Sequence, residues 1–315
     1  ESIESNLIGD FDYGFQSNIS AGFGEVDIFF SKKLAMNLGG RVDHYELWNQ
    51  TLFSPRASIA YKSGEFSQFS FAYGKFFQNP SADFLKFNDI ITAENASHFI
   101  ANFQYVKSKK IFRVEAYHKT YDDLVKFDTE FPTFTSSYNS TGSGYASGVD
   151  LFWRDNESFK NLEYWASYSY LDTERDYRNF LEKARPAFAS EHNLSLVAKY
   201  WIEDWKSQLG FSHVFASGRN YTDPNSNGFL NRETKNFNSL SLNWAYLIDK
   251  QKILYFSVSN VLGTRNIFGY NYANEMDMSG VFQREAILPN TDQFFFVGFF
   301  WTLSDDKKSN QLNNL

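Results

Sequence analysis

Cysteine is absent from this chain of 315 residues, which excludes disulfide bonds, thiolate metal ligands and a cysteine nucleophile. The sequence also lacks an apolar run of the roughly 18 residues that a transmembrane helix needs. A net charge of −7 argues against non-specific binding of nucleic acid. The chain starts at Glu1 without a signal peptide, as expected of a processed exported protein or of an excised fragment.

Aromatic residues, in contrast, are abundant. They make up 19% of the chain, with 35 Phe and 19 Tyr, although only 43% of the residues are hydrophobic. The mean hydropathy is −0.45. A soluble core of this size would draw more on Leu, Ile and Val, whereas a barrel wall in lipid is rich in aromatic residues on one face and polar on the other. The composition therefore favours a wall with two different faces.

Apolar and polar side chains alternate with the period of a β-strand. Between 239 and 248 one face is apolar and the other is small or polar, with Leu240, Leu242, Trp244, Tyr246 and Ile248 opposite Ser239, Ser241, Asn243 and Ala245. The same pattern covers 34–43 and 193–202, and 294–303 forms an aromatic-rich final strand. Without a spanning helix, a closed barrel is the remaining way to cross a membrane.

The pattern predicts an all-β fold, an antiparallel transmembrane β-barrel of which about 13 to 14 strands are present. An additional strand could precede Asn18. The predicted strands are 19–30, 34–47, 52–62, 67–77, 96–106, 110–125, 144–154, 162–171, 193–202, 206–216, 238–247, 252–262 and 293–303.

The connections alternate in length along most of the chain. The short ones are 31–33, 63–66, 107–109, 155–161, 203–205 and 249–251, and the long ones are 78–95, 126–143, 172–192, 217–237 and 263–292. Outer-membrane barrels have tight periplasmic turns and extended external loops, so the alternation predicts a periplasmic C-terminus. We expect residues 1–303 to form barrel wall and residues 304–315 to form a polar tail.

Four segments resemble a known family. They are 54–62 (Ser-Pro-Arg-Ala-Ser-Ile-Ala-Tyr-Lys), 71–80 (Phe-Ala-Tyr-Gly-Lys-Phe-Phe-Gln-Asn-Pro), 113–119 (Arg-Val-Glu-Ala-Tyr-His-Lys) and 258–263 (Val-Ser-Asn-Val-Leu-Gly). Their order and spacing over nearly the whole chain resemble the C-terminal part of the barrel of a TonB-dependent outer-membrane receptor, in the style found in Bacteroidetes.

The resemblance implies a barrel of about 22 strands in the bacterial outer membrane, filled by an N-terminal plug. It also implies energised uptake of a scarce nutrient, such as a siderophore, vitamin, peptide or glycan, through the TonB complex. The chain has too few strands for the full barrel and no plug-like region, so we expect it to be the C-terminal portion. Its implied partners are outer-membrane lipid, its own plug, the TonB complex and the ligand.

One loop carries half of a calcium-binding spacing. Asp223, Asn225, Asn227 and Gly228 match the first half of a calcium loop, in which oxygen ligands occupy alternate positions. The closing acid should stand at Thr234, whereas the nearest acid is Glu233. An ordinary polar turn accounts for the same residues, and we predict no metal site.

The histidines do not form a catalytic or metal-binding pattern. They are scattered singly, without the spacing of ligand pairs such as His-Glu-x-x-His, at His44, His98, His118, His192 and His213. No serine and histidine stand out as a pair for nucleophilic catalysis. We therefore expect structural or interfacial histidines and a protein that is not an enzyme and uses no cofactor.

Charged residues gather on one face of a single predicted strand. Arg113, Glu115 and Lys119 share that face with Tyr117 and Tyr121, and Phe112, Val114 and Ala116 lie on the other. A charged lumen that touches substrate or plug is one interpretation. A ladder of cross-strand ion pairs, which any polar interior face needs, is the other.

Two groups of aromatic residues suggest two roles. Trp153, Trp165, Tyr168 and Tyr170 fit the interfacial girdles of a barrel. A ligand platform in the long loops would use Tyr138, Phe180, Tyr221, Phe229, Tyr270 and Tyr272, because rings supply large contact area at low entropic cost. Packing within the loops explains the second group equally well, so the ligand-binding residues stay unknown at this point.

Energised uptake is the function that the resemblance implies. An alternative is a self-contained passive outer-membrane channel of about 14 strands. A third interpretation is a structural or adhesion barrel whose external loops bind a partner. The sequence does not identify the ligand, because specificity is set by the external loops and not by the barrel wall that receptors for different ligands share.

Overall fold

A computed structural model describes residues 16–303 of the chain. Thirteen antiparallel strands form one sheet in the order β1-β2-β3-β4-β5-β6-β7-β8-β9-β10-β13-β14-β17. Their bounds are β1 (Ile19–Phe29), β2 (Leu34–Tyr45), β3 (Gln50–Lys62), β4 (Ser67–Gln78), β5 (Glu94–Lys107), β6 (Lys110–Phe127), β7 (Tyr138–Asp155), β8 (Leu162–Asp176), β9 (His192–Ile202), β10 (Ser207–Ala216), β13 (Phe237–Asp249), β14 (Lys252–Ser259) and β17 (Phe294–Trp301).

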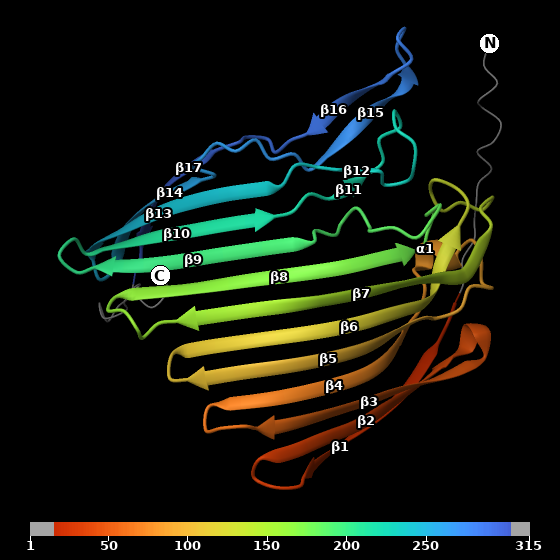
Figure 1. The fold of residues 1–315 in the computed structure, drawn as a ribbon, viewed down its shortest axis with the longest axis horizontal. Helices are drawn as coiled ribbons and strands as arrows, with labels where there is room; N and C mark the ends of the chain where they lie inside the picture. Colours follow the sequence, from red (N-terminus) through yellow and green to blue (C-terminus); the bar gives the residue numbers. More distant parts are fainter. Residues whose placement is uncertain (1–15, 304–315) are drawn as a thin grey trace.

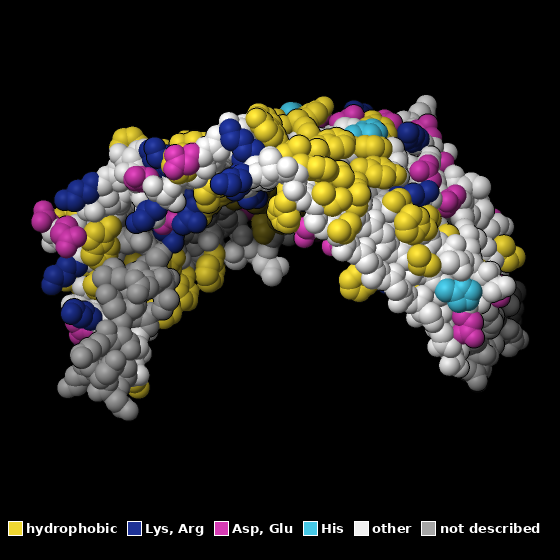
Figure 2. Space-filling view, turned by 90° about the horizontal axis from the view of Figure 1, so that it is seen from below, with side chains coloured by type: hydrophobic (Ala, Val, Ile, Leu, Met, Phe, Trp, Pro, Cys, Tyr) yellow, Lys and Arg dark blue, Asp and Glu magenta, His cyan; other side chains and the backbone are white. Residues whose placement is uncertain are grey.

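The sheet curves into an open arch. Figure 1 shows neighbouring strands stacked in sequence order from β1 to β17. The view from below shows the hollow of the arch and hydrophobic side chains gathered over its crown (Figure 2). Within the described residues β1 and β17 each pair on one side only, so the barrel is not closed. The predicted all-β antiparallel wall is confirmed, as part of a barrel.

The two ends of the strands differ, as predicted from the connection lengths. Short turns join the strands at one end, which we call the turn end, and long connections join them at the other, the loop end (Figure 1). One loop-end connection is short, because only η1 (Glu46–Trp48) and Asn49 separate β2 from β3. The helix α1 (Ala82–Leu85) lies in the connection from β4 to β5. No helix of the described chain is apolar and long enough to cross a membrane.

Two of the long connections contain hairpins that the alternation did not predict. Residues 217–236 include β11 (Asn220–Tyr221) and β12 (Arg232–Glu233). The connection from β14 to β17 includes β15 (Gly269–Met276) and β16 (Phe282–Ile287). Each hairpin forms its own two-stranded sheet beyond the barrel wall, and both rise at the loop end (Figure 1).

The predicted loop 126–143 is wrong at both ends, because β6 continues to Phe127 and β7 begins at Tyr138, which leaves 128–137 as the connection. The stretch is rich in Ser, Thr, Asn and Gly, which favour turns in isolation. Here small residues allow close pairing instead. A Cβ at Gly142 would lie 2.6 Å from the carbonyl oxygens of Leu124 and Asp176 on the two neighbouring strands. Likewise β8 runs to Asp176, past the predicted end at 171.

The additional strand proposed before Asn18 falls largely on residues 1–15, and the polar tail on residues 304–315. Both lie outside the described residues.

The register confirms the predicted alternation of faces. Leu242, Trp244 and Ile248 are 43%, 40% and 43% exposed and share what we call the apolar face. Asn243 pairs with Ser257 on the opposite face, which we call the polar face. One face of the wall is therefore rich in exposed hydrophobic side chains, of the kind that face lipid in membrane barrels.

Aromatic rings reach the polar face near β17. Tyr255 lies 6.1 Å from Phe296 and 6.4 Å from Phe300 between ring centroids. Gly298 stands between these two phenylalanines, and a Cβ there would be 2.9 Å from Phe296. At the turn end the rings adjoin a buried cluster of Ala245, Leu247 and Ile253 that packs against Trp201 and Tyr255. The last strands thus carry apolar side chains on both faces.

Candidate functional site

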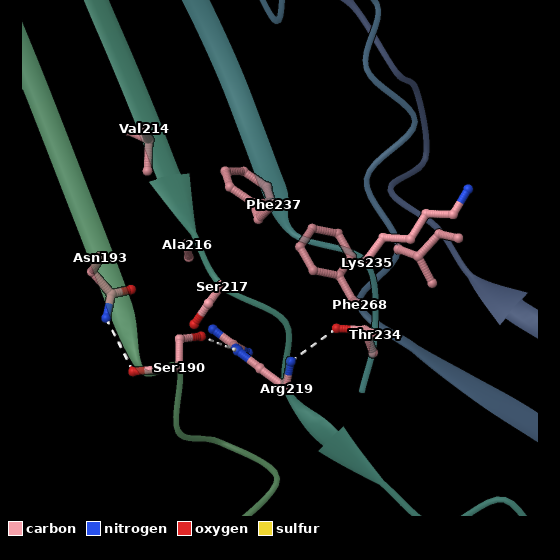
Figure 3. A pocket seen from close by; sticks show the side chains of 11 residues that line it. Ser190, Asn193, Val214, Ala216, Ser217, Arg219, Thr234, Lys235, Phe237 and Phe268 are labelled. Atoms are coloured by element: carbon pink, nitrogen blue, oxygen red, sulfur yellow. Dashed lines mark hydrogen bonds between the residues drawn. The ribbon is translucent and has the colours of Figure 1, made fainter. Parts of the chain in front are cut away.

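A cavity of about 300 Å³ opens at the loop end of β9, β10 and β13. Figure 3 shows Phe237 and Phe268 side by side on one wall. Their ring centroids are 6.1 Å apart and the rings are stacked. Arg219 and Ser190 lie opposite, where Arg219 Nε donates to Ser190 Oγ at 3.4 Å. The cavity therefore combines an aromatic wall with a cation and hydroxyl groups.

The backbone around this cavity is held by side chains. Arg219 N donates to Thr234 Oγ1 at 3.0 Å (Figure 3), and Gly218 N donates to Asn236 Oδ1 at 3.0 Å. Asn266 extends the edge of the sheet, because its Oδ1 accepts from Asn238 N at 2.9 Å and its Nδ2 donates to Asn238 O at 3.0 Å. The connections that frame the cavity are therefore fixed by hydrogen bonds from side chains to the backbone and do not depend on regular secondary structure.

The two hairpins of the loop end contact each other. Asn225 Nδ2 donates to Phe282 O at 2.9 Å, and Phe282 N donates to Asn225 Oδ1 at 2.8 Å. The rings of Tyr221 and Tyr270 lie 4.8 Å apart. The Arg284 guanidinium stacks over Tyr270 at 4.8 Å. Residues far apart in the sequence thereby form one continuous structure above the cavity.

A second aromatic contact joins the connection from β8 to β9 with the hairpin β11–β12. Phe180 lies 4.8 Å from Tyr177 and 4.9 Å from Phe229. The predicted platform residues Phe180, Phe229, Tyr221 and Tyr270 are thus brought together in two pairs. Tyr138 is not with them. It packs against the buried cluster of Leu85, Ile91 and Val125.

Two arginines contact the ring of Tyr177. The guanidinium carbon of Arg175 lies 5.6 Å from the ring centroid and that of Arg178 lies 5.2 Å from it. Arg175 also lies 4.4 Å from Tyr121 and 5.4 Å from Phe188. Sequence reasoning did not single out these arginines, because no linear motif joins residues on β6, β8 and the following connection.

The half calcium motif folds as a polar turn. Asp223 Oδ1 accepts from Asn225 N at 2.9 Å, and the Asn225 amide is directed to Phe282. Asn231 organises the loop, since its Nδ2 donates to the carbonyl oxygens of Asp223 and Ser226 at 3.1 and 2.9 Å. Asp223 Oδ1 and Asn225 Oδ1, two of the oxygens that a cation would share, are thus engaged within the loop and with the neighbouring hairpin.

The tip of the hairpin β15–β16 turns around one carboxylate. Hydrogen bonds from Ser279 and Gln283, with backbone donors including Val281, hold the pKa of Asp277 far below its usual range. The unfolded pKa is higher, so the carboxylate stabilises the turn at neutral pH.

We expect this contribution to be intact above about pH 4 and to be lost as the pH falls toward the depressed pKa of Asp277. Hydrogen exchange of the segment 276–283 in the full-length protein measures it. The Asp277→Asn variant should show at neutral pH the low protection factors that the wild-type segment shows in acid, each taken relative to the intrinsic exchange rate at its own pH. Equal protection of the variant and the wild-type chain at pH 7 would contradict the role of this carboxylate.

Residues 3–261 match the family described as TonB dependent receptor-like, beta-barrel. The chain belongs to this family. Solved structures of TonB-dependent receptors share its fold. The ferric-catecholate import receptor Fiu from K12 E. coli is 11% identical with a TM-score of 0.65, over 90% of this chain and 44% of that chain. A mutant (G324V) of the ferric enterobactin receptor PfeA from Pseudomonas aeruginosa gives 11% identity and a TM-score of 0.68, over 90% and 45%.

The FrpB iron transporter from Neisseria meningitidis is 13% identical with a TM-score of 0.67, over 92% of this chain and 46% of that chain. The chain therefore spans less than half of the solved structures it matches, and the likeness at these identities shows the fold. No curated protein matched the sequence. The proteins with this barrel are transporters and receptors of the outer membrane.

The register places the histidines of this TonB-dependent receptor barrel singly. His98 is on the polar face and the other four are on the apolar face, each beside a polar neighbour. His118 Nδ1 lies 2.7 Å from Ser147 Oγ, and His192 Nδ1 lies 2.8 Å from Tyr168 Oη. Across residues 16–303 no three His, Asp or Glu side chains are arranged to hold a metal ion.

The charged residues of β6 lie on the polar face, as predicted. Glu115 accepts from Asn102 Nδ2 at 3.4 Å, and Lys119 Nζ lies 4.8 Å from the Tyr117 ring. In the described part of the receptor neither they nor Arg113 form an ion pair, so these three do not build the expected ladder. Elsewhere on this face Arg56 Nη1 pairs with Glu25 at 3.1 Å.

The proposed girdle of aromatic residues is partly wrong. Trp153 pairs with Ala166, which places it on the apolar face with Tyr168 and Tyr170. Trp165 pairs with Arg154 and therefore lies on the polar face. The error arises because Trp165 stands one residue out of step with the other rings of β8, and a shift of one residue reverses the face.

Proposed function

We propose that this chain is the C-terminal part of the barrel of an outer-membrane receptor that imports a scarce nutrient with energy from TonB. The open sheet carries the proposal. Within residues 16–303 β1 and β17 each present an unpaired edge, and the solved relatives are more than twice as long as the matched region. The missing strands and a plug would complete the wall and fill the lumen.

In this proposal the apolar face contacts lipid and the polar face lines the lumen. The turn end, with the C-terminus, faces the periplasm, and the loop end faces the medium. The cavity beside Phe237 and Arg219 and the joined hairpins then stand at the external mouth of the barrel. A siderophore, vitamin, peptide or glycan would be held there before the plug moves.

A passive channel of about 14 strands would require β1 to pair with β17 or with one further strand. The measurement that separates the two is planar-bilayer conductance of the full-length protein, combined with receptor-dependent growth. We expect the protein to form no steady pore. We also expect cells that carry it to grow on the limiting nutrient, and to stop growing on it when TonB is deleted. A ferric catecholate is the first nutrient to try, since two of the solved relatives are named for such ligands. Steady conductance together with TonB-independent uptake would identify a passive channel.

A further inference from the structure

We propose that Arg175 and Arg178 form a subsite at the external mouth for an anionic group, a carboxylate or phosphate, of the imported ligand. The inference rests on the proposed uptake function, because it names the chemistry of a ligand that this function leaves open. It follows from where the two guanidinium groups lie and from what they do not contact.

Arg175 reaches its position across an intervening strand. Tyr121 on β6, Gly144 on β7 and Arg175 on β8 form one row of paired residues. A Cβ at Gly144 would lie 2.8 Å from Arg175 Cγ, so the glycine leaves the space in which the arginine crosses β7. The guanidinium then stacks 4.4 Å from the centroid of Tyr121. The alignment of three strands therefore positions this cation.

The row lies on the polar face. Tyr121 has the same parity along β6 as Arg113 and Glu115, opposite the lipid-type side chains Phe112 and Val114. An anion that meets Arg175 therefore comes from the lumen side of the wall. This placement favours a soluble ligand over a lipid headgroup, which would approach the other face.

Neither arginine has an anionic partner in residues 16–303. The neighbouring Asp176 pairs with Lys126, and Asp172 accepts from Tyr145 Oη at 3.1 Å. Arg175 Nε is buried and makes no hydrogen bond within the described chain. Three aromatic rings stack on the Arg175 guanidinium but supply no hydrogen-bond acceptor, so its terminal N–H groups stay available to an anion.

Arg178 is held by its backbone while its side chain is exposed. Its N donates to Val125 O at 2.6 Å, and Phe127 N donates to Arg178 O at 3.0 Å. The residue has a positive φ of 52°, which directs the chain back against β6. Arg175 and Arg178 both contact the ring of Tyr177, and each guanidinium is a fork that binds carboxylate or phosphate oxygens. Such an arrangement suits a ligand with two or more negative charges.

Isothermal titration of the purified full-length receptor with citrate, inorganic pyrophosphate and glycerol tests the subsite. We expect citrate or pyrophosphate to bind at low ionic strength, glycerol not to bind, and added NaCl to weaken the binding. Arg175→Gln should weaken the binding about 10-fold and Arg178→Gln about 3-fold. Arg154→Gln, which removes an arginine already paired with Glu163 on the same face, should change it less than about 2-fold.

Arg178 is exposed, so Arg178→Gln keeps the test valid even if Arg175→Gln does not fold. The inference is overturned if the wild-type receptor binds neither anion, or if both arginine variants bind as the wild type does. Vesicles of phosphatidylglycerol serve as a lipid arm. Binding of these vesicles that depends on Arg175 and Arg178, without binding of citrate or pyrophosphate, would also overturn the inference. Because binding is measured without TonB, such a failure leaves TonB-dependent uptake intact and is distinct from failure of the proposed function.

Discussion

Replacing Gly148 by alanine is expected to lower the free energy of unfolding of the full-length barrel by about 3 kcal/mol. A Cβ at this position would lie 2.4 Å from the carbonyl oxygen of Tyr170 and 2.4 Å from the hydroxyl of Tyr117. The Tyr117 ring is able to move away, but the Tyr170 carbonyl belongs to the backbone of β8. Urea unfolding in lipid vesicles measures the loss, with heat-dependent gel migration as the readout for folded barrel.

Gly269→Ala is the matched control, because its Cβ would meet only Ile287 Cδ1 at an ordinary 3.4 Å. The double variant Gly148→Ala with Tyr117→Ala separates the two contacts. We expect it to recover little stability, since the contact with the Tyr170 backbone remains. Full recovery would place the whole effect in the tyrosine ring, and an unchanged Gly148→Ala barrel would contradict the close approach of β7 and β8.

The wall was predictable because one physical rule governs it. In a strand with lipid on one side and water on the other, apolar and polar side chains must alternate, as Leu242 and Asn243 do. Each segment with this alternation is a strand in the structure. The rule fails where pairing continues beyond the membrane. Gly142 lies in a stretch with the composition of a turn, but it is a paired residue between two strands. Composition does not distinguish a glycine that bends the chain from one that lets strands approach.

The candidate site was predictable only in part. Long loops and their aromatic residues could be found, but not which rings meet, because Phe180 and Phe229 are joined by packing between connections far apart in the sequence. Arg175 was missed for the same reason. Its partner Tyr121 lies two strands away, and the only local signal is the glycine that stands between them. Such a row becomes visible once the register is known.

The segment 258–263, which resembles the family, contains Asn260, and the structure explains what this residue does. Its side chain is 6% exposed, and Nδ2 donates to Thr264 O at 2.8 Å and to Asp292 O at 2.7 Å. Its Oδ1 accepts from Thr264 N at 3.2 Å. The backbone has a φ of 50°, which asparagine tolerates better than most residues. One side chain thus fastens the end of β14 to the start of β17.

Replacing Asn260 by alanine should therefore destabilise the full-length barrel by about 3 kcal/mol, because the carbonyl groups of Thr264 and Asp292 lose the donor of a buried side chain and alanine resists a positive φ. Asn260→Gly removes the same hydrogen bonds without the backbone penalty, so it should be milder by about 1 kcal/mol. Hydrogen exchange is expected to rise first in β17, since Asp292 lies two residues before its start. If exchange in β17 were the same in Asn260→Ala as in the wild-type chain, this asparagine would not be what anchors the last strand.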